Sequence, residues 1–275
     1  MSSSGYAATT SRAPTRELRS AALEWAERLG VQFVPRADRS LAAICREQGV
    51  TGLLTVTRER VVFVIPDEGF EFFFHPNMAR TRIRTLRDGR GDPMVAAMAL
   101  QPGDQVLDCT LGRGSDAIVA SWVVGESVRV VGLEVVPLVA ELTIHGLRTY
   151  ELAGAGLMEA MRRIEARQGD HEQVLPALPG ACFDVVYFDP FFHEPVAESQ
   201  AMASLRRVGE HRELRPAALR EARRVARRCV VIKQRREGPF RDLPGVERVA
   251  GGAGRRVEYV VIGAVAPANE YQAPD

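Results

Sequence analysis

The sequence lacks the features of membrane, secreted and metal-binding proteins. No apolar run reaches the roughly 18 residues that a membrane-spanning helix needs. The first residues have no apolar core behind a basic segment, so we expect no signal peptide, although their Ser, Ala and Thr bias leaves a transit peptide as an alternative. The four cysteines form no CxxC pair, and no His/Cys cluster suggests a metal. We therefore expect a cytoplasmic protein with no membrane partner and no metal.

Lysine is almost absent. Lys233 is the single lysine among 36 basic residues, and the net charge is only +1. The arginines are clustered: residues 203–236 hold eleven of them, with Lys233, against three glutamates, and Arg80 and Arg84 belong to a second cluster. Such patches bind the phosphate backbone of nucleic acids. The solvent-exposed face of an amphipathic helix explains many of the arginines in residues 218–228 equally well, so both interpretations stay open.

The chain has 275 residues, enough for one large domain or two modest ones. Residues 1–15 have the composition of a disordered tail. Residues 79–102 are predicted to connect an N-terminal unit to a larger domain at 103–275. The N-terminal unit, residues 16–78, is predicted as a small α+β domain with a helix at 16–29 and strands at 52–64 and 70–74.

Strands and helices alternate from residue 103 onward. This alternation predicts an α/β fold of Rossmann-like type, with a doubly wound, mostly parallel sheet and right-handed crossovers. The last segment indicates an antiparallel C-terminal hairpin. Ligands of such sheets bind outside the carboxyl ends of the strands. The expected strands are 106–110, 128–134, 183–189 and 229–233, with helices starting near 115, 137 and 215.

The stretch LDCTLGRGSDA, residues 107–117, is a strand end followed by a glycine-containing turn. Gly112 and Gly114 allow a tight turn and a close approach of the backbone to a ligand. The helix behind them offers unpaired N–H groups. The carboxylates of Asp108 and Asp116 would repel a pyrophosphate and suit a cation such as a sulfonium. We predict a cofactor-binding turn, with an ordinary glycine-rich β–α turn as the alternative.

Acidic residues also follow the next two strands. Glu134 lies 20 residues after Gly114, where an acid can accept hydrogen bonds from both ribose hydroxyls of any nucleoside cofactor; the alternative is a solvated strand end. Asp170 precedes an apolar helix start, where it is predicted either to accept from an exocyclic adenine amine or to cap the helix. We assign Glu134, Asp170 and the adjacent His171 to the cofactor site.

The motif FDPFF, residues 188–192, ends a strand that is otherwise apolar. Asp189 and the carbonyl of Pro190 are two acceptors for an exocyclic amine, and proline fixes φ and so directs that carbonyl. A ring that follows can stack on a flat base, a role that we assign to Phe192. Phe191 stays open between substrate pocket and core. The alternative is an Asp-Pro turn followed by two core phenylalanines.

In the order DCTLGRGSDA, GLEVVPLVAELTIHGL and VVYFDPFF, these motifs resemble those of the RsmJ-type class I methyltransferases. That family acts on the guanine N2 amine of small-subunit ribosomal RNA in bacteria, with S-adenosylmethionine as cofactor. The resemblance spans residues 87–235 and departs at His193, where the family's D-P-M-F-P motif has a proline. By resemblance, the cofactor contacts are Ser115, Asp116, Glu134, Val135 and Asp189.

We therefore predict an S-adenosylmethionine-dependent methyltransferase that acts on an exocyclic amine, most specifically guanine N2 of ribosomal RNA. The target base of the RNA would be flipped out of its stack and would lie on the ring of Phe192. Its exocyclic amine would donate hydrogen bonds to the Asp189 carboxylate and the Pro190 carbonyl. The alternatives are a methyltransferase for a small molecule, DNA or a protein amide, and a non-catalytic RNA- or nucleotide-binding protein of the same fold. Further residues are assigned to substrate binding: Phe191, His193, Lys233, Arg80 and Arg84.

Overall fold

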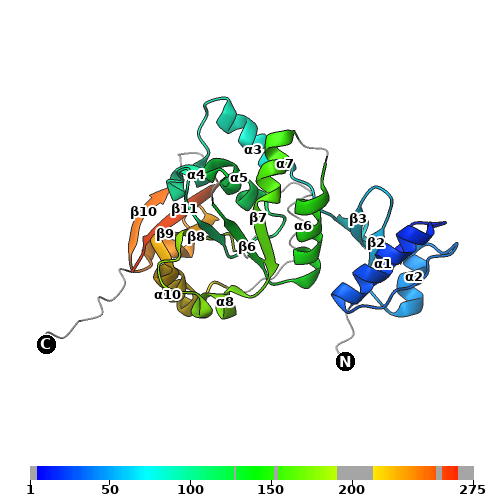
Figure 1. Cartoon of the computed structure of the whole chain (residues 1–275). Helices are drawn as coiled ribbons and strands as arrows, with labels where there is room; N and C mark the ends of the chain where they lie inside the picture. The colour runs from blue at the N-terminus through cyan, green and yellow to red at the C-terminus, as the bar shows by residue number, and fades with distance from the viewer. Residues whose placement is uncertain (1–4, 127, 152–153, 191–212, 252–255, 266–275) are drawn as a thin grey trace, which may run out of the picture. The chain divides into compact units, whose positions relative to one another are not determined.

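The computed structural model describes residues 5–126, 128–151, 154–190, 213–251 and 256–265 (Figure 1). These residues divide into two compact units, one running up to His75 and the other starting at Pro76. Each unit is described by itself below. Within the described residues, no helix is long and apolar enough to cross a membrane.

The N-terminal unit is a four-stranded sheet with two helices. Its strand order is β1-β2-β3-β4, with β1 parallel to β2 and the other neighbours antiparallel. The Thr15 side chain caps the first helix by accepting from the N–H of Leu18, and Gly30 ends it in the left-handed conformation. The elements are β1 (Tyr6–Thr10), α1 (Arg16–Leu29), α2 (Leu41–Gln48), β2 (Gly52–Val56), β3 (Val61–Ile65) and β4 (Phe70–Phe72).

The prediction of a disordered tail over residues 1–15 is wrong for Tyr6–Thr10. These residues form β1, whose last four side chains are buried. Their pairing partner is β2, more than forty residues further along the chain. Small residues such as alanine and threonine look like a tail by composition, and the long-range pairing that orders them is not visible locally. The helix α2, which the Ser40 side chain caps, is likewise absent from the sequence prediction.

The second unit is built on a seven-stranded sheet in the order β10-β11-β9-β8-β5-β6-β7. The five strands from β5 to β9 run parallel, and β11 lies antiparallel between β9 and β10. This confirms the predicted doubly wound sheet with an antiparallel hairpin. The strands are β5 (Val106–Asp108), β6 (Val130–Glu134), β7 (Ile164–Gln168), β8 (Phe183–Phe188), β9 (Ala226–Arg235), β10 (Val246–Ala250) and β11 (Val257–Gly263).

Helices cover both faces of this sheet. In Figure 1, α8 and α10 lie along the lower side of the sheet, and α4 and α5 along the upper side, where α4 contacts β9, β10 and β11 and α5 contacts β5 and β6. The helices are α3 (Asn77–Arg87), α4 (Pro93–Met98), α5 (Ser115–Val124), α6 (Pro137–Thr149), α7 (Ala155–Arg162), α8 (His171–Ala177) and α10 (Pro216–Val225).

Two predictions for this unit need correction. The segment 79–102 is not a plain connection, because it contains most of α3 and all of α4. The strand β7 was not predicted, since its sequence IEARQ is polar in alternate positions and it lies at the edge of the sheet. A strand at the edge of a sheet with one solvent-exposed face has few apolar residues, so its sequence pattern predicts a strand only weakly.

The pleat of the central strands separates an apolar face from a polar one. Successive strand residues point to opposite faces. On the side of α8 and α10 the alternate residues form a buried core. Asp108, Tyr187 and Lys233 occupy the intervening positions and therefore lie on the face of α4 and α5. The core contains Leu107, Cys109, Val131, Leu133, Val186, Phe188, Val230, Ile232, Val260 and Ile262, with Leu175 from α8 and Leu219, Ala222 and Val225 from α10.

Candidate functional site

The glycine-containing turn after β5 is fixed by backbone bonds and by a close approach to β6. Gly112 and Gly114 both have positive φ, and α5 begins directly after them. The N–H of Leu111 donates to the carbonyl of Leu133 at 2.8 Å. A Cβ on Gly132 would lie 2.5 Å from Leu111 Cδ1, so only glycine accommodates this packing. The turn is thereby held against the carboxyl end of β6, and its role in cofactor binding stays a prediction.

Thr110 connects the ends of β5 and β8. Its N–H donates to Asp108 Oδ1 at 3.0 Å, and its hydroxyl oxygen accepts from the N–H of Asp189 at 2.6 Å. Asp108 is only 2% exposed. Burial raises the pKa of Asp108 to about 8, because few groups around it stabilise the charge. This carboxyl is therefore largely protonated at neutral pH, which argues against the predicted role of Asp108 as a fixed anion.

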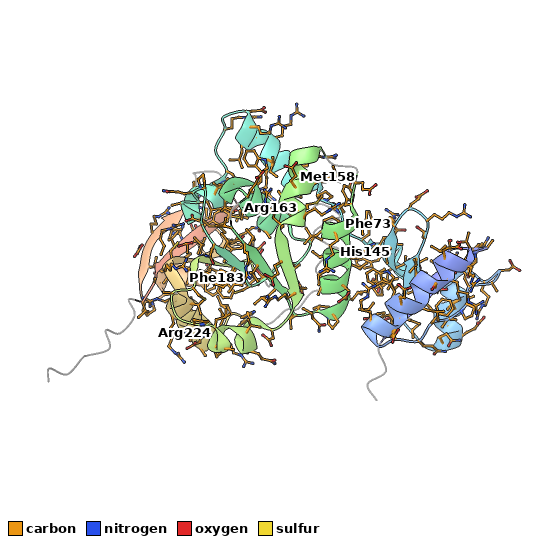
Figure 2. All side chains as sticks on the ribbon, in the orientation of Figure 1. Phe73, His145, Met158, Arg163, Phe183 and Arg224 are labelled. Atoms are coloured by element: carbon orange, nitrogen blue, oxygen red, sulfur yellow. The ribbon has the colours of Figure 1, made fainter. Side chains whose placement is uncertain are left out.

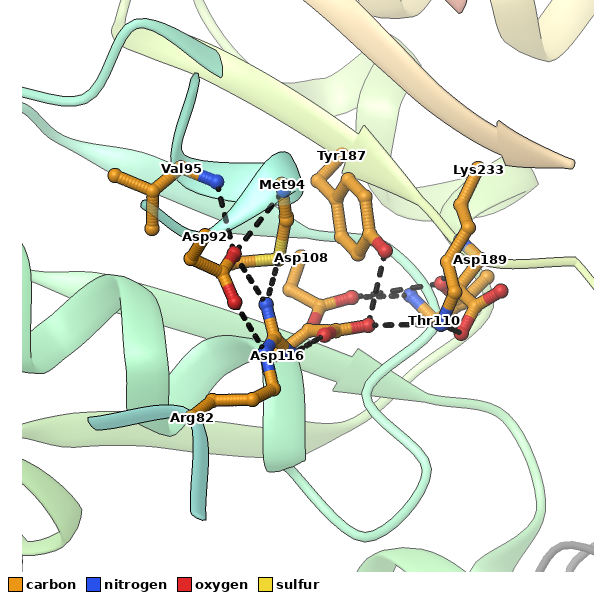
Figure 3. A network of polar contacts seen from close by, with 10 residues as sticks. All are labelled: Arg82, Asp92, Met94, Val95, Asp108, Thr110, Asp116, Tyr187, Asp189 and Lys233. Carbon is orange, nitrogen blue, oxygen red and sulfur yellow. Dashed lines mark hydrogen bonds and ion pairs between the residues drawn. The ribbon is translucent and has the colours of Figure 1, made fainter. Parts of the chain in front are cut away.

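Asp116, in the first turn of α5, is the centre of a charged network (Figure 3). The hydroxyl of Tyr187 donates to its Oδ2 at 2.9 Å, and the guanidinium of Arg82 donates to its Oδ1. Lys233 Nζ lies 3.5 Å from Oδ2. Burial opposes ionisation, but Lys233 and Arg82 outweigh it and hold the pKa of Asp116 well below its usual range. Asp116 is thus satisfied within the protein and is not an open site for a cation.

Arg82 joins α3 and the start of α4 to this network. Its Nε donates to Asp92 Oδ2 at 2.7 Å, and its Nη2 donates to Asp92 Oδ1 at 2.9 Å, in a bidentate pair. Asp92 also caps α4 by accepting from the N–H groups of Met94 and Val95. The sequence placed Arg82 in the same basic cluster as Arg80 and Arg84, which is wrong for Arg82 because its guanidinium binds Asp92 and Asp116, and it did not single out Asp92. The available signal was the position of Asp92 before Pro93, which is a common start of a helix.

Asp189 follows β8 directly and faces the end of β9. Lys233 Nζ lies 2.6 Å from its Oδ2. Burial and the charge of Asp116 raise the pKa of Asp189, while Lys233 acts in the opposite direction. Pro190 is half-buried next to it. The predicted stacking and substrate residues Phe191, Phe192 and His193 lie outside the described residues, and their roles stay predictions.

Glu134 ends β6 and is 8% exposed. Its Oε2 accepts from the N–H of Gly112 at 3.0 Å, and its Oε1 accepts from the N–H of Val136 at 2.9 Å. One carboxylate oxygen therefore faces the turn after β5, and the other is bound to the segment between β6 and α6. The predicted contact with a ribose stays a prediction, and the solvated strand end is excluded by the burial. Val135 and Ser115 are half-buried beside these groups.

Asp170 and His171 lie after β7, at the start of α8. Asp170 Oδ1 accepts from the N–H of Glu172 at 2.9 Å, so the helix cap that the sequence analysis considered is present. The ring of His171 packs edge-on against Phe188, with centroids 5.3 Å apart. A carboxylate that caps a helix through one oxygen still has lone pairs for a ligand. An adenine contact of Asp170 therefore stays a prediction.

The arginines predicted to bind nucleic acid fall into two groups. On α3, Arg80 and Arg84 are exposed, and Arg87 lies on the same helical face. In residues 213–236, by contrast, several arginines bind the protein itself. Arg224, labelled in Figure 2, donates to the carbonyls of Leu178 and Leu175 at 2.9 Å.

Three neighbouring arginines of the same stretch also have internal partners. Arg223 donates to the carbonyl of Gly263, Arg227 to that of Ala181, and Arg228 pairs with Asp104 at 2.6 Å. These arginines lie between the end of α10 and the start of β9. They are therefore near the amino ends of the parallel strands, whereas Asp189 follows the carboxyl end of β8. The interpretation of residues 203–236 as one continuous phosphate-binding stretch is therefore wrong for this part.

The ends of β5, β6, β7 and β8 thus bring together the turn and acidic groups that the sequence predicted for a nucleoside ligand. The carboxylates of Asp92, Asp116 and Asp189 outnumber the cations of Arg82 and Lys233. The cluster keeps a net negative charge, which fits a positively charged ligand. Within the described residues, no group of His, Cys, Asp and Glu has the arrangement of a metal site.

Comparison with known proteins identifies the kind of protein that this site belongs to. Residues 53–249 match the family described as "Putative SAM-dependent methyltransferase". The chain is 40% identical over 231 residues to the uncharacterized protein YpiP of Bacillus subtilis, covering 84% of this chain and 89% of that protein.

Relatives with a named substrate and a solved structure show the same relationship. The chain is 30% identical to the ribosomal RNA small subunit methyltransferase J of Pseudomonas aeruginosa strain LESB58, over 82% of this chain and 83% of that protein. The crystal structure of the SAM-dependent methyltransferase NGO1261 from Neisseria gonorrhoeae superposes with a TM-score of 0.64 at 20% identity, covering 97% of this chain and 99% of that one. At this identity the structural match supports the fold.

Proposed function

The chain belongs to the SAM-dependent methyltransferase family, and from that premise we propose that it methylates the N2 amine of guanine in small-subunit ribosomal RNA. Relatives named ribosomal RNA small subunit methyltransferase J, at about 30% identity, support the substrate class. The observation that carries the choice of an amine is the position of Asp189. Asp189 follows β8, and its backbone N–H is linked through Thr110 to the turn proposed to hold the cofactor.

S-adenosylmethionine supplies a methyl group attached to a positively charged sulfur. The residues proposed to hold it are arranged to fit its chemistry. The Gly112–Gly114 turn leaves room for close approach, and the net negative cluster around Asp116 favours the positive charge. Glu134 is oriented by two backbone N–H groups toward the turn, where its remaining lone pairs can accept from ribose hydroxyls. Ser115, Val135, Asp170 and His171 complete the proposed cofactor contacts.

The methyl acceptor is positioned by the residues after β8. The Asp189 carboxylate and the Pro190 carbonyl accept the hydrogens of the amine, so that the nitrogen lone pair is directed at the methyl carbon. When bound, S-adenosylmethionine would supply the methyl group to this nitrogen, and the proton that the nitrogen loses would pass to the Asp189 carboxylate that accepts its hydrogen bond. Holding the two reactants in line is worth several orders of magnitude in rate, and no metal is needed for this transfer. Phe192 is proposed to stack on the flipped base.

We propose the outer face of α3 as a contact for the RNA backbone. Arg80, Arg84 and Arg87 are exposed at helical spacing, and the helix itself contains no acidic residue. Arg82 on the same helix reaches inward to Asp116, so this basic face belongs to an element that is directly bound to the site. Phosphate contacts fix the orientation of an RNA without reading its sequence.

The experiment that tests the proposal uses bacteria that lack the gene for this protein. Their small subunits and naked 16S RNA are incubated with the purified protein and radiolabelled S-adenosylmethionine, and the modified nucleoside is identified by mass spectrometry. We expect one N2-methylguanosine, formed by the wild type and lost with Asp189→Ala. Label on another position, or full activity of Asp189→Ala, would contradict the proposal.

A small-molecule amine is the second candidate acceptor. The observation in its favour is that Arg223, Arg224, Arg227 and Arg228 donate to groups of the protein itself, which leaves fewer of their donors for an RNA backbone. Substituting the exposed arginines of α3 separates the two candidates. The substitutions should impair methylation of RNA and leave methylation of a small amine intact.

A further inference from the structure

Lys233 is placed beside Asp189 by the register of the sheet. Phe188 pairs with Ile232 in the parallel ladder of β8 and β9, so the next residues on each strand, Asp189 and Lys233, lie side by side. The Nζ–Oδ2 distance is 2.6 Å, against 3.5 Å from Nζ to Asp116. The side chain of Lys233 is 19% exposed and that of Asp189 is 24% exposed. The closer contact of this ammonium is therefore the one with Asp189.

The other carboxylate near Lys233 has partners of its own. Asp116 accepts from Tyr187 and from Arg82, so it stays compensated without the lysine. Asp189 differs, because Lys233 is its one side-chain ion-pair partner within the described part of the chain. Its Oδ1 has no hydrogen-bond partner among those residues, whereas its Oδ2 is bound to Nζ. One oxygen is thus held by the lysine, and within the part of the chain that the structure describes the other is left for a ligand.

We propose that Lys233 is a positioning residue for methyl transfer: its ammonium holds Oδ2 of Asp189 and keeps the carboxylate ionised, so that Oδ1 can accept from the substrate amine. This inference rests on the proposed function for the identity of the amine. It replaces the sequence-based assignment of Lys233 to direct substrate contact, since the ammonium is already engaged with two carboxylates.

The electrostatics of the site explain why such a residue is needed. Burial and the charge of Asp116 both raise the pKa of Asp189, which would favour its protonated form. In a protonated carboxyl one oxygen carries a hydrogen and acts as a donor, so the group is a weaker acceptor for an amine hydrogen. An opposite charge at this distance lowers the pKa of an aspartate by about 1–3 units. The charged and titratable groups that face the pair are Asp116 from α5, Arg82 from α3, Tyr187 from β8, Tyr259 from β11 and Asp108 from β5.

The sequence provides an unusually direct test, because Lys233 is the only lysine in the chain. Protein labelled with ¹³C,¹⁵N-lysine, and carrying no lysine in a tag, gives one side-chain NMR signal, that of Lys233. We expect this signal to shift with pH in a step that reports the ionisation of Asp189. Asp189→Asn should abolish the step, and the control Asp88→Asn, at an exposed carboxylate of another ion pair, should leave it. An unchanged step in Asp189→Asn overturns the proposal.

Kinetics test the consequence for the reaction. Activity that needs an ionised Asp189 falls as the pH drops through its pKa. The acidic limb is the part of the pH–activity profile in which activity falls as the pH drops. In Lys233→Met this limb should move to higher pH by about one unit or more. In Lys233→Arg, which keeps the positive charge, the limb should lie near its wild-type position. A purely structural role would lower kcat at all pH values without moving the limb, and that result overturns the proposal.

A second variant covers the case in which Lys233→Met does not fold. Asp116→Asn removes a negative charge that raises the pKa of Asp189, and it leaves Lys233 to Asp189 alone. The acidic limb should then move to lower pH at saturating cofactor; a shift to higher pH, or none, contradicts the inference.

The two proposals, the Lys233–Asp189 ion pair and the methylation of ribosomal RNA, fail in different ways. A wild type with the NMR step but no ribosomal RNA methylation contradicts the proposed function and leaves the Lys233–Asp189 ion pair standing.

Discussion

The N–H of Asp189 donates to the hydroxyl oxygen of Thr110 at 2.6 Å, across the gap between the ends of β8 and β5. Thr110 also donates its own N–H to Asp108. A single side chain therefore fixes the backbone of the proposed amine-binding residue to the turn that is proposed to hold the cofactor. In the proposed reaction, we expect the relative position of the two reactants to depend on this hydroxyl.

Replacing that hydroxyl should affect catalysis more than folding. In Thr110→Val the N–H of Asp189 loses its acceptor, which corresponds to about 1–3 kcal/mol for a polar group left unsatisfied. We expect kcat to fall by about tenfold or more, because the misplacement acts on the reacting geometry. Steady-state methylation assays with Thr110→Ser as the control measure this, since serine keeps the hydroxyl. A loss in Thr110→Ser but not in Thr110→Val would show that the methyl group of threonine, rather than its hydroxyl, matters.

Removing the charge of Arg82 should destabilise the second unit. Arg82→Met leaves Asp92 and Asp116 without their bidentate and bridging partner. Breaking a buried ion pair by removing one member costs about 3–5 kcal/mol, because the remaining charge stays buried. The free energy of unfolding in urea measures the effect. Arg84→Met, on the exposed face of the same helix, is the matched control and should change stability by no more than about 0.5 kcal/mol.

Asp108 should make the protein less stable as the pH rises. Its pKa is raised to about 8 in the folded state, so between its usual value and pH 8 the folded protein binds more protons than the unfolded chain. The free energy of unfolding therefore decreases with pH in this window, by at most about 1.4 kcal/mol per pH unit. Asp108→Asn cannot ionise, so its stability relative to the wild type should increase from pH 5 to pH 8. Urea unfolding at several pH values tests this, and a constant difference would contradict it.

The outer face of α3 should contribute to RNA affinity through charge alone. The triple variant Arg80→Ala, Arg84→Ala, Arg87→Ala should weaken binding uniformly across RNA sequences and reduce the slope of log K against log salt by about two to three. Arginines that are exposed elsewhere in the same unit provide a control with the same change of charge. That control is Arg148→Ala, Arg220→Ala, Arg256→Ala. Equal effects of the two triple variants would mean that overall charge, and not the α3 face, determines affinity.

The sequence determined the type of fold and the edge of the sheet at which the site lies. The alternation of strands and helices from residue 103 predicted the parallel sheet, because local apolar periodicity reflects burial on each face. The turn at Gly112 and the acids Glu134 and Asp189 were found for the same reason, since each directly follows an apolar strand. Carboxyl ends of parallel strands meet at one edge, so their convergence follows from topology alone.

Only the tertiary structure decided which charged side chains form ion pairs with one another. Nothing local in the sequence links Arg82 to Asp116, or Lys233 to Asp189, because these partners lie 34 and 44 residues apart and meet through helix packing and strand register. The same holds for Arg223, Arg224 and Arg228, whose spacing suggested a phosphate surface but which bind carbonyls and carboxylates of the protein. Composition gives the number and sign of the charges, whereas the state and role of each one depend on partners and burial that only the folded chain provides.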